Sequence, residues 1–251
     1  MSALLDVSDL SAGYGVAQAV RGATFSLDRG KILSIVGPNG AGKTTLLLAL
    51  SGMLKPSAGS VRLAGKDLTG MAAHKVAQSG MCLIPDDRGL FPDLTVNEHF
   101  RMAERSAVRR KRVAALSTQQ VLESFPRLAG LRDRRCGLLS GGEQQMLAVA
   151  KVLLLTPDVL MVDELSMGLA PVIVQELLPA MRRIAGETGM TMLIVEQHYE
   201  LALAIADDAI VLSHGQTVLQ GTASSMLADR RALESAYLGG GDTEDSPKAG
   251  R

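Results

Sequence analysis

The glycine-rich segment Gly37-Pro38-Asn39-Gly40-Ala41-Gly42-Lys43-Thr44 narrows the folds open to this chain to a small set. The apolar run Ile32–Val36 before it predicts a buried strand, and we expect a helix from Lys43 to about Ser51. Glycines let successive backbone N–H groups turn toward phosphate oxygens, and the helix N-terminus adds the positive end of its dipole. The pattern G-x-x-x-x-G-K-[ST] between a strand and a helix therefore predicts a loop that binds nucleotide phosphates.

The residues of this loop have separate expected roles. Lys43 is expected to reach the outer phosphates and to take part in catalysis, and the hydroxyl of Thr44 is placed to ligate Mg²⁺. An ordinary glycine-rich turn would predict neither of these two side chains. The expected ATP-binding residues of the loop are Gly37, Pro38, Asn39, Gly40, Ala41, Gly42, Lys43, Thr44 and Thr45.

A second apolar run, Val159–Val162, ends in two carboxylates, Asp163 and Glu164. Ligands of parallel sheets bind at the carboxyl ends of the strands. Asp163 is therefore expected to hold Mg²⁺, directly or through water, and Glu164 to act as general base toward the water that attacks the terminal phosphate. Taken alone, a strand that ends in two acids is equally consistent with a solvated strand end. The phosphate loop favours the catalytic interpretation.

The segment Ser140-Gly141-Gly142 precedes an expected helix. Ser140 is a suitable helix cap, and the two glycines would expose backbone N–H groups to an anion. This segment is a second candidate phosphate site in the same chain.

The rest of the chain alternates between strand-like and helical patterns. Residues 95–155 are dominated by helical patterning and predict a helical insertion in an α/β core, and residues 239–251 predict a disordered tail. A helix is expected near Pro171. The other expected strands are Leu4–Leu10 and Ala19–Leu27, separated by a turn at Gly13-Tyr14-Gly15, then Met81–Ile84 and Met190–Val195, and a hairpin of Ala209–Leu212 and Thr217–Gln220.

Composition limits the partners and the compartment. Lys plus Arg (26) balances Asp plus Glu (26) in the 251 residues, which argues against a nucleic-acid partner. No uncharged apolar stretch reaches the ~18 residues of a membrane-spanning helix, and the N-terminus lacks the pattern of a signal peptide. The two cysteines, Cys82 and Cys136, have no metal-ligand spacing and are interpreted as buried side chains in a reducing cytoplasm.

The segment Leu139-Ser140-Gly141-Gly142-Glu143-Gln144-Gln145 resembles LSGGQ, the signature motif of ABC ATPases, with one Glu inserted. The order of phosphate loop, signature and acidic strand matches that family from about Leu4 to Gln220. The resemblance implies an α/β fold: a P-loop NTPase core with an N-terminal antiparallel β-subdomain and an inserted helical subdomain. It implies one domain over residues 1–238.

The family resemblance also implies a mechanism. Two cassettes would pair head to tail, so that the signature of one chain contacts the nucleotide of the other. Tyr14 would stack on adenine, although an ordinary core or turn tyrosine is the alternative, and Gln197 stands at the catalytic switch position. Asp86 stands at the position that approaches the metal. The residues that would serve the partner's ATP are Ser140, Gly141, Gly142 and Glu143.

Four positions depart from the usual family pattern. Asp86 replaces Gln or Glu, and Gln197 replaces the histidine found in most of the family. Leu165 replaces the proline that usually follows the catalytic Glu, which predicts a looser loop around Glu164. Ala170 replaces the usual Asp. We expect hydrolysis to survive these changes, because Lys43, Asp163 and Glu164 are intact. A degenerate, regulatory nucleotide binder is the alternative.

Several segments more closely resemble the shorter ATPase subunit of branched-chain amino-acid importers, among them Gly168-Leu169-Ala170-Pro171 and Ala236-Tyr237-Leu238-Gly239-Gly240. This implies integral-membrane permeases and a second ATPase subunit as partners. A heterodimer is favoured over a homodimer. An extracytoplasmic solute-binding protein would take part indirectly, and the chain would be peripheral at the cytoplasmic face of the membrane. Urea or amide importers, exporters and soluble ABC ATPases are the alternatives.

Overall fold

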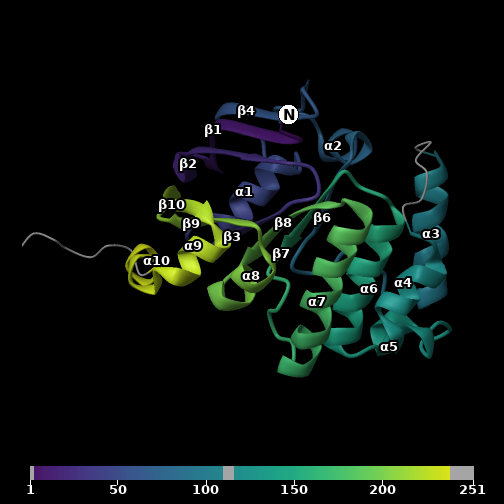
Figure 1. Ribbon diagram of the computed structural model, residues 1–251. Helices are drawn as coiled ribbons and strands as arrows, with labels where there is room; N and C mark the ends of the chain where they lie inside the picture. The colour runs from purple at the N-terminus through teal and green to yellow at the C-terminus, as the bar shows by residue number, and fades with distance from the viewer. Residues whose placement is uncertain (1–2, 110–115, 238–251) are drawn as a thin grey trace, which may run out of the picture.

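A computed structural model describes residues 3–109 and 116–237 (Figure 1). Its centre is a six-stranded sheet in which the five strands other than β10 run parallel, and β10 pairs antiparallel with β9 at one edge. The α/β fold predicted from the sequence is confirmed. In spatial order the strands are β10 (Gln216–Thr222), β9 (Asp208–Ser213), β3 (Ile32–Val36), β8 (Thr191–Glu196), β7 (Val159–Asp163) and β6 (Met81–Ile84).

An antiparallel sheet formed by the N-terminal part of the chain lies beside this central sheet (Figure 1). Its first two strands are longer than predicted, so the hairpin turn lies at Gly15 and Val16 and Tyr14 is the last residue of its strand. Two further strands were not predicted. In spatial order the strands are β2 (Ala17–Leu27), β1 (Leu5–Tyr14), β4 (Ala58–Leu63) and β5 (Lys66–Asp67).

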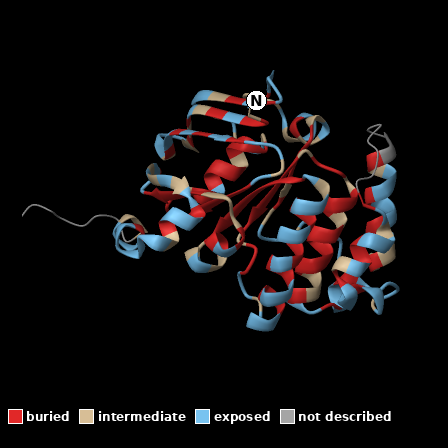
Figure 2. Cartoon of the chain, viewed as in Figure 1, coloured by how far each residue is buried: buried red, intermediate tan, exposed pale blue. Residues whose placement is uncertain are grey.

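The middle of the central sheet is buried on both faces (Figure 2). Alternate residues of β3, β7 and β8 face helix α1 (Lys43–Leu50) and the N-terminal sheet. The others face helices α6 (Gly141–Leu154), α7 (Pro171–Thr188) and α8 (Tyr199–Ile205). Every residue of these three strands is buried. A parallel strand covered on both faces needs apolar residues at consecutive positions, which explains why these runs show no alternation.

Helices dominate the segment between β6 and β7, as expected. Helix α4 (Thr118–Ser124) begins with a capping box, because Ser117 accepts from the Gln120 N–H and the Gln120 side chain accepts from the Ser117 N–H. Helix α2 (Ala73–Ser79) precedes β6 and was not predicted. The other elements here are α3 (Val96–Arg109), α5 (Pro126–Ala129) and a 3₁₀ helix (Cys136–Leu138).

Three short helices, α8 (Tyr199–Ile205), α9 (Ala223–Ala228) and α10 (Arg230–Tyr237), pack against β3 and β9, and α9 and α10 were not predicted. In the described part of the chain no helix is long and apolar enough to cross a membrane. Both cysteines are buried, as expected. The predicted disordered tail at 239–251 lies outside the described residues.

Candidate functional site

The carboxyl ends of the parallel strands meet at one edge of the central sheet. Val36 at the end of β3 pairs with Glu196 at the end of β8, and Val195 of β8 pairs with Asp163 at the end of β7. The loops that follow these strands, and the loop that begins at Pro85 after β6, therefore start side by side. This register brings together the phosphate loop and the acidic residues, which are far apart in the sequence.

The backbone of the phosphate loop is braced by two neighbouring elements. Gly42 has φ +100°, and a Cβ atom there would lie 2.2 Å from the carbonyl oxygen of Ala19 in β2. The backbone N–H of Gly215, in the β9–β10 turn, donates to the Ala41 carbonyl oxygen at 3.0 Å. Helix α1 then begins without a side-chain cap and without an acidic residue in its first turn. Its first N–H groups therefore have no side-chain acceptor competing with an anion.

Lys43 lies under this loop with only 4% of its surface exposed. Its Nζ donates to the carbonyl oxygens of Gly37 at 2.8 Å and Pro38 at 3.0 Å. Burial lowers the pKa of the ammonium group. Three nearby carboxylates oppose this shift, those of Glu164, Asp163 and Glu196. The ammonium group is therefore surrounded by the acidic ends of β7 and β8.

Asp163 ends β7 in a buried position. Burial raises the pKa of its carboxyl group, the Thr44 hydroxyl beside it lowers this pKa, and the carboxylates of Glu164 and Asp86 raise it further. Its Oδ1 atom is buried and accepts no hydrogen bond within the described residues. Asp86 itself is exposed in the loop after β6. The structure thus brings together all three side chains predicted to bind metal, Thr44, Asp86 and Asp163.

Glu164 is half-buried and adopts a left-handed backbone conformation with φ +45°. Its N–H donates to the carbonyl oxygen of Val195 at 3.0 Å, which ties the residue to β8. Leu165 is 1% exposed, and Ser166 binds the buried carboxylate of Glu196. We expected Leu165 to leave this loop loose. In the structure, however, packing or hydrogen bonds hold each of the three residues in place.

Gln197 follows β8 at the same edge of the sheet. Its carbonyl oxygen accepts a 2.7 Å hydrogen bond from the Tyr237 hydroxyl, and the ring of Tyr237 packs on that of Tyr199, with centroids 5.5 Å apart. The last described helix, α10, is therefore connected to the predicted switch position. His198 is the N-cap residue of α8.

The signature segment begins α6 as predicted. Ser140 is the N-cap and accepts from the Glu143 N–H, while the Glu143 carboxylate accepts from the Ser140 N–H at 2.7 Å. Gly141 is exposed, whereas Gly142 is buried, and a Cβ atom there would lie 2.9 Å from side-chain carbons of Ile173. The expectation that both glycines expose their backbone is therefore met only by Gly141.

Arg88 links the loop after β6 to the signature helix, a contact that we did not predict. Its Nε donates to Gln145 Oε1 and its Nη1 to Gln144 Oε1, both at 2.9 Å. The same loop contacts α6 again where the Lys151 Nζ donates to the Gly89 carbonyl oxygen at 2.6 Å. In the sequence, the signal that could have indicated the contact with Arg88 was the pair of consecutive amide side chains, Gln144 and Gln145.

Tyr14, predicted to stack on adenine, lies at the end of β1 with 57% of its surface exposed. It pairs with Ala17, close to the part of β2 that braces the phosphate loop at Ala19. An exposed ring in this position is available to a planar ligand, whereas a buried ring would have favoured the alternative of a core tyrosine.

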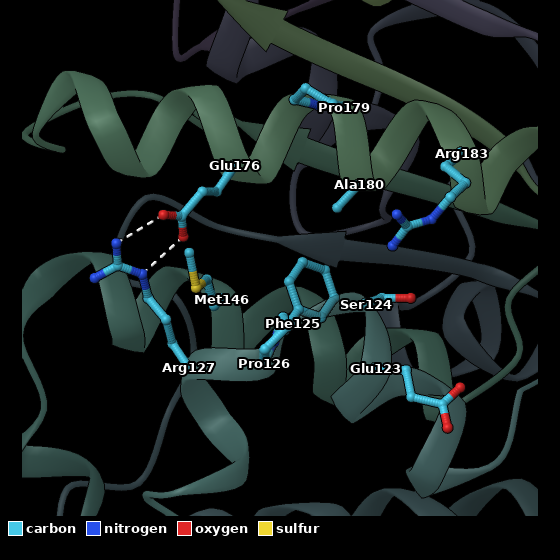
Figure 3. Close-up of a pocket in the computed structure, with 10 residues that line it drawn as sticks. All are labelled: Glu123, Ser124, Phe125, Pro126, Arg127, Met146, Glu176, Pro179, Ala180 and Arg183. Atoms are coloured by element: carbon cyan, nitrogen blue, oxygen red, sulfur yellow. Dashed lines mark hydrogen bonds and ion pairs between the residues drawn. The ribbon is translucent and has the colours of Figure 1, made fainter.

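A cavity of about 380 Å³ lies away from these residues, where α4 and α5 meet α7 (Figure 3). Phe125, Pro126 and Ala180 line it, and Arg127 of α5 forms a two-pronged ion pair with Glu176 of α7 at 2.7 Å. Arg127 and Glu176 already neutralise each other, and the cavity lies apart from the glycine-rich loop and the acidic strand ends. The edge of the sheet remains the candidate site.

Comparison with known proteins identifies the family. The sequence model described as "ABC transporter" matches residues 20–166, more than half of the chain. The chain belongs to the ABC transporter family. As an ABC ATPase it binds ATP and couples ATP hydrolysis to transport.

Individual relatives are similar over nearly the whole chain. The high-affinity branched-chain amino acid transport ATP-binding protein BraG of Pseudomonas aeruginosa is 36% identical over 94% of this chain and 100% of its own length. The thiamine import ATP-binding protein ThiQ of Ruegeria sp. is 34% identical over 86% of this chain and 92% of its own. The crystal structure of an ABC transporter cassette in its ADP conformation superposes with a TM-score of 0.80, at 25% identity, over 95% of this chain and 100% of that one.

Proposed function

We propose that this ABC ATPase is the shorter ATP-binding subunit of an importer for branched-chain amino acids. The observation that carries the proposal is the alignment with BraG, which covers the whole of that relative. The sequence identity to ThiQ is slightly lower and the alignment covers less of the chain. Because ThiQ is named for import of a different solute, the two relatives together support an importer more strongly than they support branched-chain amino acids as its solute. Related urea or amide importers remain the alternative.

The phosphate loop and the first turn of α1 are proposed to hold the nucleotide phosphates. The free N–H groups at the start of α1 suit an anion, and the ammonium group of Lys43 would move from the carbonyls of Gly37 and Pro38 to the outer phosphates. Tyr14 would stack on the adenine ring with its exposed face.

Mg²⁺ fits the group of oxygen donors at the end of β7. Asp163 carries a buried oxygen atom without a hydrogen-bond partner in the described residues, and the Thr44 hydroxyl lies beside it. Mg²⁺ prefers oxygen ligands and is usually held by one or two protein side chains together with phosphates and water. We propose Thr44 and Asp163 as its protein ligands, with Asp86 approaching through water. The bound ion would neutralise phosphate charge.

Glu164 is proposed to accept the proton of the water that attacks the terminal phosphate. Its carboxylate is half-buried, whereas the neighbouring Asp163 is buried against Thr44, so the two acids have different environments. Lys43 would stabilise the charge on the transferred phosphoryl group. The Gln197 amide would hydrogen-bond this group but cannot carry a proton.

The proposed partners follow from the same assignment. A second ATPase subunit would place its phosphate loop against the signature of this chain, where Ser140 and Gly141 are exposed and Glu143 is half-buried at the start of α6. The pair would attach to two permease subunits at the cytoplasmic face of the membrane. A solute-binding protein would act through the permeases. We propose a heterodimer of two different ATPases, and no nucleic-acid partner.

Affinity purification of the chain from native membranes in mild detergent, followed by identification of every co-purifying chain, tests this proposal. Recovery of two permeases and a second cassette would support the importer, and the solute-binding protein associated with them could then be tested for leucine, isoleucine and valine. Recovery of a urea or amide receptor would overturn the solute assignment. Recovery of soluble partners alone would overturn the assignment to an importer.

A further inference from the structure

Glu196, the last residue of β8, is an acidic side chain to which no role has yet been given. Only 1% of its surface is exposed. Its Oε1 accepts a 2.6 Å hydrogen bond from the Ser166 N–H, and its Oε2 accepts a 2.8 Å hydrogen bond from the Ser166 hydroxyl. One carboxylate therefore binds both the main chain and the side chain of a residue in the loop after β7.

These two bonds are strong because they form in a buried site. Burial is the largest effect and raises the pKa of the Glu196 carboxyl group, although the two bonds from Ser166 act in the opposite direction. A buried carboxylate that already accepts two bonds is poorly placed to take a proton from water, whereas Glu164 is half-buried and accessible.

The loop that Glu196 holds is the loop that carries Glu164. Ser166 lies two residues after Glu164. Leu165 between them is buried, but unlike the proline usual at this position in the family it does not restrict the backbone dihedral angle φ. The Glu164 N–H is bound to the carbonyl oxygen of Val195. The end of β8 thus holds the loop on both sides of Leu165, at Glu164 through its main chain and at Ser166 through Glu196.

We propose that Glu196 is a positioning residue, which fixes the backbone after Glu164 through Ser166 and so aims the Glu164 carboxylate at the attacking water. The inference rests on the proposed role of Glu164. A displacement of about 1 Å at a reacting group can lower a rate about 100-fold, so a loop that moves freely would reduce turnover without weakening nucleotide binding.

Three variants test the inference by steady-state ATP hydrolysis of the intact complex. Glu196→Ala removes both acceptors, and we expect kcat to fall about 10- to 100-fold while KM for ATP changes by less than about twofold. Glu196→Gln keeps one acceptor, and its amide N–H₂ can donate to a Ser166 hydroxyl that has rotated. We therefore expect Glu196→Gln to retain most of the turnover. Ser166→Ala should cause a smaller loss and should add nothing further in the Glu196→Ala background.

Glu200→Gln is the matched control, because it removes an exposed acid nearby on α8. Its kcat and KM should remain those of the wild type. If Glu196→Ala does not fold, Ser166→Ala decides the question. Wild-type kcat in Glu196→Ala, or in Ser166→Ala when the former does not fold, would overturn the inference.

Equal losses in Glu196→Gln and Glu196→Ala would also overturn it, because the charge of Glu196 would then be what matters. The role of Glu164 is tested separately with Glu164→Gln. If that variant still turns over ATP, the proposed mechanism fails. If it is inactive while Glu196→Ala is fully active, only the positioning role fails.

Discussion

Substituting Gly42 tests how tightly the phosphate loop is braced by β2. A side chain at φ +100° costs about 1–2 kcal/mol in backbone strain. The added Cβ would also lie 2.2 Å from the Ala19 carbonyl oxygen, a main-chain atom of a paired strand that cannot turn away. Overpacking of this kind costs about 1–3 kcal/mol more. We therefore expect Gly42→Ala to lower the free energy of unfolding by about 2–5 kcal/mol in total.

Gly65 provides the matched control, because it has φ +78° and open space where a Cβ would be. Gly65→Ala should therefore lower the free energy of unfolding by only the strain contribution, about 1–2 kcal/mol. Urea denaturation of the two purified variants measures the difference, and titration with ATP should show weakened binding only in Gly42→Ala. Equal destabilisation of both variants, with unchanged ATP affinity, would refute the idea that β2 holds the loop in shape.

Two further predictions concern the loop after β6. Arg88→Ala should lower the free energy of unfolding in urea by about 1–2 kcal/mol, because two amide acceptors on α6 lose a charged donor, whereas removing the exposed Arg101 should have almost no effect. His99 accepts from the Phe91 N–H, and burial lowers the pKa of its imidazole below 6.5. Its stabilising contribution should therefore be complete above about pH 6.5 and decrease as the pH falls from there toward the folded-state pKa. Urea midpoints measured against pH should show this loss, and His99→Gln should flatten that part of the profile.

Local sequence was sufficient to predict the strands that position the proposed phosphate site. The bounds of β3 and β6 agree with the prediction, because each is a short apolar run that ends at a proline or glycine. The strand β7 was predicted within one residue. The sheet edge then follows from a general rule, since parallel strands place their carboxyl ends together. The apolar runs and this rule for parallel sheets were together enough to predict that Lys43 and Asp163 would lie close together.

Contacts set by register and packing could not be predicted in this way. The predicted strand ended at Val195, one residue too early, so Glu196 was left outside the buried sheet. The rule that drew attention to Asp163, an acid at the end of an apolar strand, would have identified Glu196 as well. By contrast, the pairing of Glu196 with Ser166 depends on two strands separated by a long helix. The burial of Gly142 against Ile173 likewise depends on how two helices pack.

Glu164→Gln gives the most direct test of the central claim, which is that Glu164 at the end of β7 drives hydrolysis of ATP held by the loop after β3. ATP affinity and phosphate release should be measured on the same purified preparation. We predict wild-type affinity with turnover abolished, whereas Lys43→Ala should lose affinity as well. Unchanged turnover in Glu164→Gln would contradict the account and remove Glu164 from the mechanism.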